Sequence, residues 1–130
     1  MSHPLEILYV DDEPDIREVA AMSLELDGTT TVRAVGSGAE ALAVLDKGDC
    51  TPDVILLDVM MPDMDGPATL AEIRKREPFA ETPVVFITAR AQAHEQARFL
   101  SLGAIGVITK PFDPMTLPIE LRAIVVRAGL

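Results

Sequence analysis

Short apolar runs alternate with segments of helical periodicity along the whole chain. Residues 5–10, 54–57 and 84–87 are almost continuously apolar over the length of a strand, which is typical of strands covered on both faces of a sheet. Residues 30–35 and 104–109 are more mixed, which is typical of edge strands. The pattern therefore predicts five strands, three of them interior.

The first helix is predicted to begin at Pro14, because proline suits a first helical turn and acidic residues favour the positive end of a helix. An apolar stripe at 3.6-residue spacing follows it, and we expect this stripe to face the core. The stripe consists of Ile16, Val19, Ala20, Met22 and Leu26.

The next three helices also carry start or stop signals. Ser37 and Glu40 form a capping box before the second helix, and residues 65–67 (Asp-Gly-Pro) open the third. A fourth helix is predicted over residues 91–101, and Gly103 suits the position just after its end.

The start of the fifth helix is ambiguous. Asp113-Pro114 could open it, but Pro118 would then disturb a helix already begun. We therefore favour a start near Leu117, with Thr116 as the cap and an end near Val126.

Five strand-then-helix units in strict alternation predict parallel strands with helices on both faces. With the three most apolar runs in the interior, the strand order is 2-1-3-4-5. This is a flavodoxin-like, doubly wound (βα)5 fold of the α/β class. The 130 residues are predicted to be one domain, 1–130, with no output domain.

The composition limits the classes of partner. With 21 acidic and 11 basic residues the net charge is −10, which argues against direct nucleic-acid binding and suits protein partners or a divalent cation. The N-terminus lacks the pattern of a signal peptide, and no apolar run is long enough to span a membrane. We expect a cytoplasmic protein.

Polar residues that could take part in catalysis or metal binding follow the predicted strands at one edge of the sheet. Residues 11–13 (Asp-Asp-Glu), Asp58, Thr88 and Lys110 stand at the carboxyl ends of four different strands, where ligands bind in open α/β sheets. Clustered carboxylates repel one another unless they are neutralised, and Mg²⁺ is a natural counterion for them. A carboxylate nucleophile, a divalent cation, an ammonium and a hydroxyl together predict phosphoryl transfer to an aspartate.

A calcium-binding loop is a competing interpretation of residues 61–72. Asp63 and Asp65 fall at ligand positions of an EF-hand loop, but Met61 occupies the first position and a strand precedes the loop. We reject this interpretation and expect the two aspartates to be loop and helix-cap residues.

Four segments together resemble the receiver domain of bacterial two-component response regulators. They are "YVDDEPDIREV", "DVILLDVMMPDMDG", "VVFITA" and "GAIGVITKPFD", and they occur in the family's order over essentially the whole chain. The resemblance implies that Asp58 is the phosphoacceptor. It also implies a Mg²⁺ (or Mn²⁺) site made by Asp12, Asp58, the backbone carbonyl of Met60 and, through water, Asp11.

The resemblance also assigns roles at the far side of the pocket. Thr88 resembles the switch hydroxyl and Lys110 the lysine that contacts the phosphoryl group, with a cis peptide expected before Pro111. Val107 departs from the family, because it replaces an aromatic ring whose rotation often reports phosphorylation. We expect backbone shifts in the loop that follows Thr88 to transmit the signal instead.

Three further residues are expected near the site. Ala89 and Arg90 follow the switch threonine, and Arg90 and Met60 flank the expected approach of hydrolytic water. We expect Arg90 and Met60 to tune the lifetime of the aspartyl phosphate.

The resemblance implies a protein partner on each side of the switch. The phosphoryl donor is expected to be a histidine of a sensor kinase or of a phosphotransfer protein. Output is expected through the face formed by the fourth helix, the fifth strand and the fifth helix, where Ile124, Val125 and Val126 make the fifth helix widely apolar. A weak homodimer through this face is a minority hypothesis beside a monomer.

Two alternative functions remain open. One is a phosphohydrolase with an aspartate nucleophile, although enzymes of the haloacid-dehalogenase type carry a second acid where this chain has Met60. The other is a pseudo-receiver scaffold that binds partners without phosphorylation, although no expected site residue is lost. Apart from self-phosphorylation and self-dephosphorylation, we expect no enzymatic activity.

Overall fold

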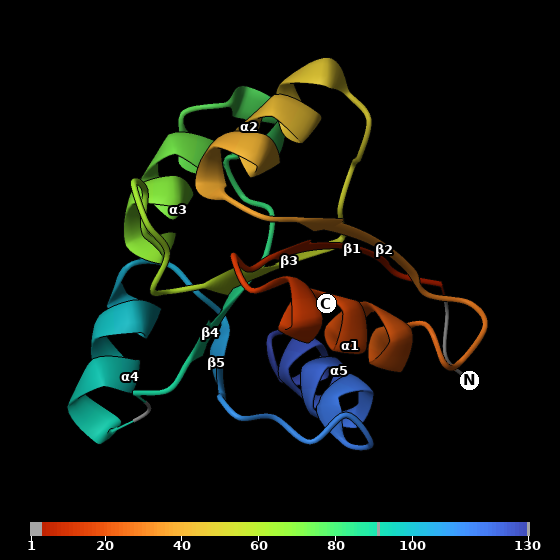
Figure 1. The fold of residues 1–130 in the computed structure, drawn as a ribbon. Coiled ribbons are helices and arrows are strands. Elements are labelled where there is room, and N and C mark those ends of the chain that lie inside the picture. The colour runs from red at the N-terminus through yellow and green to blue at the C-terminus, as the bar shows by residue number, and fades with distance from the viewer. Residues whose placement is uncertain (1–3, 91, 130) are drawn as a thin grey trace.

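The computed structural model describes residues 4–90 and 92–129, which form one parallel sheet between two layers of helices (Figure 1). The strand order is β2-β1-β3-β4-β5, with every neighbouring pair parallel, so the predicted topology is confirmed. The strands are β1 (Glu6–Val10), β2 (Thr31–Val35), β3 (Val54–Asp58), β4 (Val84–Thr88) and β5 (Gly106–Thr109).

Two helices cover one face of the sheet and three cover the other (Figure 1). The first layer holds α1 (Pro14–Leu24) and α5 (Leu117–Arg127), and the second holds α2 (Gly38–Lys47), α3 (Gly66–Arg74) and α4 (Ala93–Ser101). A short 3₁₀ turn, η1 (Glu77–Phe79), precedes β4. Within the described residues, no helix is long and apolar enough to cross a membrane.

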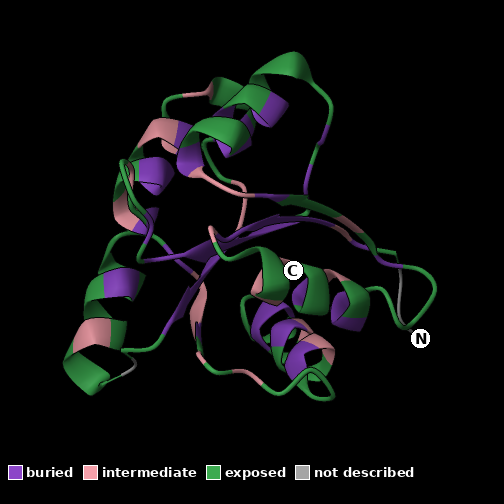
Figure 2. Ribbon diagram, in the orientation of Figure 1, coloured by how far each residue is buried: buried purple, intermediate pink, exposed green. Residues whose placement is uncertain are grey.

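The three interior strands are buried along almost their whole length (Figure 2). Successive residues point to opposite faces, so Leu8 and Val10 belong to the core under α2–α4, whereas Ile7 and Tyr9 belong to the core under α1 and α5. Continuous apolar runs are therefore needed to fill both cores at once.

The helix starts follow the predicted signals with small differences. The Ser37 side chain accepts a hydrogen bond from the Glu40 amide, and Asp65 likewise caps α3. Helix α5 begins at Leu117 as favoured, but the Thr116 hydroxyl makes no capping bond. Helix α4 begins at Ala93, and residue 91, where the prediction began, lies outside the described residues.

The predicted core stripe of α1 is largely wrong. Of its five members only Ala20 is fully buried, while Val19, Met22 and Leu26 are 42%, 64% and 71% exposed. The buried face runs instead through Ala20, Ser23 and Leu24, because α5 and its preceding loop pack there and the Ser23 hydroxyl donates to a main-chain carbonyl of that loop. Helix α1 therefore turns part of its apolar surface toward solvent.

Gly66 sets the position of α3 against the sheet. A Cβ atom there would lie 2.5 Å from the Asp58 carbonyl oxygen and 3.1 Å from the Phe86 ring. The Gly66 amide also donates to the carbonyl of Val59 at 2.9 Å. The first turn of α3 can lie directly against the end of β3 only because this residue has no side chain.

We predict that Gly66→Ala destabilises the protein by about 1–3 kcal/mol, because the methyl group would displace backbone rather than a mobile side chain. Urea denaturation followed by circular dichroism measures the change. Ala71→Ser is the control, since it enlarges an exposed side chain of the same helix, and it should change the free energy of unfolding by less than about 1 kcal/mol. Equal stabilities of the two variants would contradict this account of Gly66.

Candidate functional site

The predicted polar residues converge at the carboxyl edge of the sheet, where the strand order reverses between β1 and β3. Asp11, Asp58 and Thr88 are 0%, 4% and 2% exposed, so three polar side chains are buried at the ends of three adjacent strands. The Lys110 side chain, from the end of β5, is also largely buried. The parallel arrangement brings these groups together as expected.

The ammonium of Lys110 stands among three carboxylates. Its Nζ atom lies 3.0 Å from Asp11 Oδ2, 3.2 Å from Asp58 Oδ2 and 3.6 Å from Glu13 Oε1. Burial alone would lower the pKa of Lys110, but its contacts with Asp11 and Asp58 outweigh burial and raise that pKa. Lys110 therefore stays protonated and supplies a positive charge to the pocket.

Asp58 is held in a less favourable environment than an ordinary aspartate. Its pKa is raised to about 6, and burial is the main cause. The attraction of Lys110 lowers this pKa, and repulsion by Asp11 and Asp12 raises it. One lysine thus compensates only part of the energy needed to keep this carboxylate ionised.

Asp11 is anchored through both of its carboxylate oxygens. Oδ1 accepts the amide of Glu13 at 3.0 Å, and Oδ2 accepts the Tyr9 hydroxyl at 3.0 Å. The Arg17 guanidinium donates to the Asp11 main-chain carbonyl at 2.8 Å. Burial, with the charge of Asp11, raises the pKa of Tyr9, so this hydroxyl remains a donor.

The acidic residues fit a hard divalent cation. Carboxylate oxygens of Asp11, Asp12 and Glu13 lie within 4.8 Å of one another, and Asp58 reaches the same ammonium as two of these acids. Clustered oxygen donors with excess negative charge are the ligand set that Mg²⁺ prefers. Glu13 was not among the predicted ligands, yet it belongs to this cluster.

Hydrogen bonds connect the end of β4 with the residues that follow β4 and β5, on the far side of the pocket. The Thr88 side-chain oxygen accepts the amide of Arg90 at 3.0 Å, and the Thr88 carbonyl accepts the amide of Lys110 at 2.8 Å. Ala89 and Arg90 are exposed. The peptide bond between Lys110 and Pro111 is cis, as predicted.

Three other predicted residues lie around the pocket. Met60 is 67% exposed beside the end of β3. Asp65 caps α3, and Asp63 is an exposed loop residue, as expected when the calcium loop was rejected. Val107 is partly buried against the core under α4 and pairs with Phe86 in the sheet.

The sequence analysis did not identify Tyr9 and Arg17 as residues of the site. Tyr9 was read only as one apolar residue of a strand, although it lies two residues before Asp11, a spacing that puts side chains on the same face. Arg17 lies one helical turn after Glu13, and nothing in the sequence pattern marks it as a support for Asp11.

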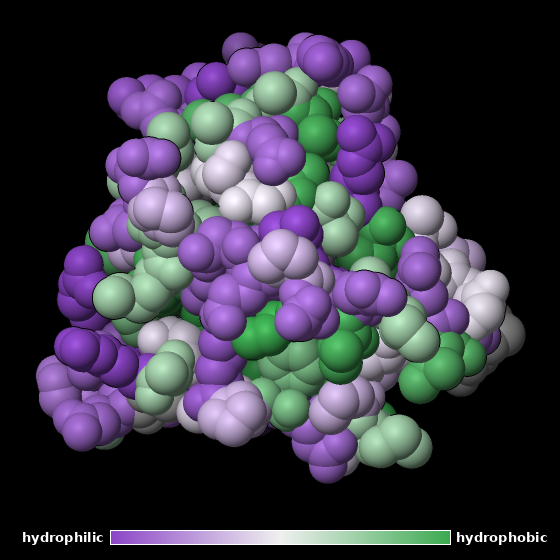
Figure 3. Space-filling model, in the orientation of Figure 1, coloured by the Kyte–Doolittle hydropathy of each residue, from purple (hydrophilic) through white to green (hydrophobic). Residues whose placement is uncertain are grey.

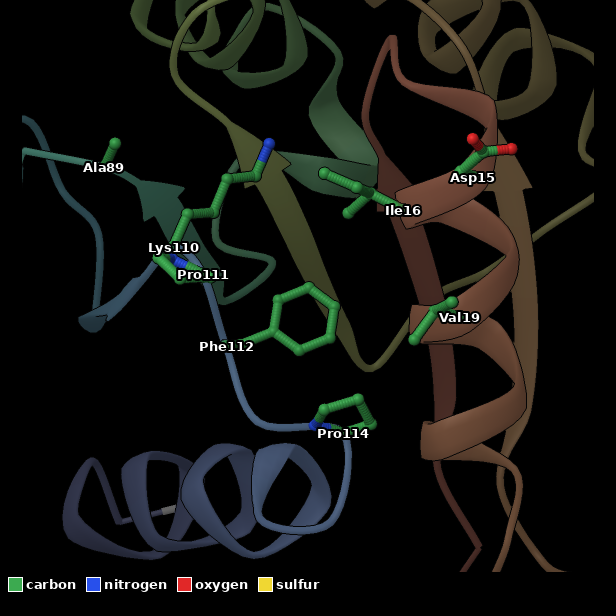
Figure 4. A pocket seen from close by; sticks show the side chains of 8 residues that line it. All are labelled: Asp15, Ile16, Val19, Ala89, Lys110, Pro111, Phe112 and Pro114. Atoms are coloured by element: carbon green, nitrogen blue, oxygen red, sulfur yellow. The ribbon is translucent and has the colours of Figure 1, made fainter.

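An apolar hollow lies directly beside the site, between α1 and the loop that leads into α5. It has a volume of about 350 Å³, and Figure 4 shows Lys110 and Ala89 at one end and Pro114 at the other, with Phe112 between. In Figure 3, apolar surface shows over α1 and this loop. The exposed Val19 forms part of the wall.

Comparison with known proteins identifies the family of this chain. Residues 7–122 match the response regulator receiver domain. The chain belongs to the response regulator receiver family. Receiver domains of this family act in general as phosphorylation-dependent switches rather than as enzymes, and they bind Mg²⁺ at an acidic pocket.

Several relatives illustrate the match. The transcriptional regulatory protein TrcR of Mycobacterium tuberculosis is 37% identical over 97% of this chain and 47% of its own length. The phosphate regulon transcriptional regulatory protein PhoB of Pseudomonas aeruginosa is 34% identical over 95% of this chain and 52% of its own length. The structure of the chemotaxis response regulator CheY4 of Vibrio cholerae superposes with a TM-score of 0.81 at 31% identity, covering 92% of this receiver and 98% of CheY4. The receiver thus spans about half the length of the curated relatives.

The raised pKa of Asp58 gives a pH-dependent prediction for the metal-free protein. The folded state binds the Asp58 proton more tightly than the unfolded state, so this group makes stability fall as the pH rises from about 4 to about 6. Asp58→Asn removes the charge, and it should stabilise the protein by about 1–3 kcal/mol near pH 7. The gain should shrink as the pH falls through 6.

Urea denaturation in EDTA at several pH values tests this prediction. Asp49→Asn is the control, since Asp49 is an exposed acid away from the pocket. A stability gain for Asp58→Asn that does not change with pH would show that charge burial is not its cause.

Proposed function

We propose that this receiver accepts a phosphoryl group from a phosphohistidine onto Asp58, in a reaction that depends on Mg²⁺ or Mn²⁺. The observation that carries the proposal is a buried carboxylate, Asp58, ion-paired to Lys110 in a pocket that holds three further acids. A donor on a sensor histidine kinase or phosphotransfer protein fits the family, and the resulting aspartyl phosphate would act as the switch.

The chain's own groups supply a direct route for the transfer. A carboxylate oxygen of Asp58 attacks phosphorus, a P–O bond forms, and the P–N bond to the donor imidazole breaks. The ammonium of Lys110, already 3.2 Å from the attacking group, neutralises charge on the phosphoryl oxygens. We assign the Thr88 hydroxyl, buried at the end of the next strand, as a donor to the phosphoryl group.

The cation would be held by the acids of the same edge. We assign Asp12, Asp58 and the backbone carbonyl of Met60 as its direct ligands, with Asp11 holding bound water. When bound, the cation supplies positive charge to the phosphoryl oxygens and to the crowded carboxylates. Asp12, half-buried at the rim, is more accessible than Asp11, which is fully buried and has a donor on each carboxylate oxygen.

We propose that the phosphorylated receiver signals by protein–protein contact at the face of α4, β5 and α5. Ile124 and Val125 prove to be core residues, which leaves Val126, 70% exposed, as the apolar surface residue of that part of α5. A homodimer there stays a prediction. So does the single-domain organisation, since curated relatives that match this receiver are about twice its length and include transcriptional regulators.

We place the phosphodonor protein over the apolar hollow beside α1. The hollow starts at Lys110 and Ala89, so a partner seated in it would hold its histidine next to Asp58. An exposed apolar surface adjoining a charged pocket is typical of a protein-interaction site.

The central prediction concerns the acceptor residue. Incubation with acetyl phosphate and Mg²⁺ should add the mass of one phosphoryl group to the wild type, and hydroxylamine should remove it, as expected for an acyl phosphate. Asp58→Asn should gain no mass, whereas Asp63→Asn should behave as the wild type because that acid lies in the exposed loop. Intact-protein mass spectrometry measures all three.

The alternatives predict different results in the same preparation. A phosphohydrolase would turn over p-nitrophenyl phosphate many times. A pseudo-receiver would gain no mass, and its binding to a partner would be unchanged by Asp58→Ala with or without phosphodonor. Either result would replace the proposed function.

The docking proposal predicts that the two kinds of donor separate. Val19→Asp should lower the rate of phosphotransfer from a histidine kinase by about tenfold or more, since a charge in the hollow must be desolvated on docking. The rate from acetyl phosphate should not change. Leu102→Asp, a charge at a similarly exposed apolar position after α4, is the control and should keep both rates.

A further inference from the structure

Tyr9 places a hydroxyl in the floor of the acidic pocket. Its side chain is 0% exposed, and its hydroxyl donates to Asp11 Oδ2 at 3.0 Å. The ring packs in the core under α1 and α5, among residues such as Leu24 and Leu117. A phenylalanine would fill the same apolar space, so the hydroxyl is the group that reaches the pocket.

The hydroxyl shares its acceptor atom with Lys110. Asp11 Oδ2 receives both the Tyr9 hydroxyl and the Lys110 ammonium, each at 3.0 Å, while Oδ1 receives the Glu13 amide. The Glu13 amide and the Tyr9 hydroxyl alone fix the orientation of the carboxylate. Lys110 can therefore move toward a phosphoryl group on Asp58 without leaving Asp11 free to rotate.

We infer that Tyr9 is a positioning residue of the acidic pocket, whose hydroxyl holds the Asp11 carboxylate in the orientation that binds a divalent cation. This inference rests on the proposed function of the pocket and adds a residue to it. Tyr9 touches neither the phosphoryl donor nor the acceptor, and it acts only through Asp11.

The simpler reading is that a buried tyrosine needs some acceptor for its hydroxyl. On that reading Tyr9→Phe would change stability alone. On ours, Tyr9→Phe leaves Asp11 Oδ2 held by Lys110 alone, with Oδ1 still bonded to the Glu13 amide, so a cation meets a less well oriented carboxylate. Loss of a group that orients a metal ligand typically weakens binding by about 10–100-fold.

Calorimetric titration with MgCl₂ tests the inference without any phosphoryl donor. We expect the dissociation constant of Tyr9→Phe to rise by about tenfold, the lower end of that range, because Asp11 contacts the cation through water. Ser23→Ala is the matched control: it removes another buried hydroxyl of the α1–α5 layer, one that donates to the Pro114 carbonyl. Its dissociation constant should equal that of the wild type.

A spectroscopic measurement on the unmutated protein gives an independent readout. Tyr9 is the single tyrosine and the chain has no tryptophan, so its intrinsic emission reports this one side chain. An ionised carboxylate that accepts a phenol hydrogen bond quenches the phenol. The emission should therefore change during the Mg²⁺ titration with the calorimetric midpoint, and Asp11→Asn should be brighter and unresponsive.

The possible results are distinct. Equal Mg²⁺ affinity of Tyr9→Phe and wild type, or wild-type emission that ignores bound Mg²⁺, would overturn the role of Tyr9 and leave the proposed function intact. A wild type that binds no Mg²⁺ at all would overturn both. If Tyr9→Phe does not fold, the emission titration of the wild type decides alone.

Discussion

The contact of one ammonium with three carboxylates is the interaction on which this structure depends. Lys110 reaches from the edge strand β5 to acids that follow β1 and end β3, and so crosses the end of β4. Because Asp58 is almost fully buried, its charged form is costly and the attraction of Lys110 offsets part of that cost. The lysine makes the arrangement tolerable but does not neutralise it. The pocket is therefore electrostatically unfavourable, and binding a cation there would relieve the repulsion between its carboxylates.

The strands and the convergence of polar residues at one edge of the sheet could be predicted because local pattern and topology determine them together. Continuous apolar runs identify interior parallel strands, and parallel strands must share one carboxyl edge. Once the runs ending at Asp58 and Thr88 are placed in the interior, their polar ends have to meet. This inference needs no information on side-chain packing, and for the same reason it places Asp11 and Lys110 at that edge as well.

Features that depend on packing between elements could not be obtained in the same way. The exposed flank of α1, with Val19 and Met22, has the same 3.6-residue spacing as a core stripe, and only the position of α5 decides which flank is covered. Tyr9 shows the converse case. It is buried like its apolar neighbours, yet one atom of it belongs to the acidic pocket, and a hydropathy pattern cannot separate the ring from its hydroxyl.

The same distinction bears on how the switch is read. Val107 stands in place of an aromatic residue and pairs in the sheet with Phe86, whose ring contacts that of Phe99 with centroids 5.1 Å apart; both rings are buried in the core. Neither ring can swing as an exposed one could, because close packing leaves a large side chain no second position. The main chain offers a different connection, since the Lys110 amide is bonded to the Thr88 carbonyl and the Thr88 side chain to the Arg90 amide. A displacement of Lys110 or Thr88 toward a phosphoryl group would be felt by the main chain after Thr88 through these bonds, and transmission by backbone shifts stays a prediction.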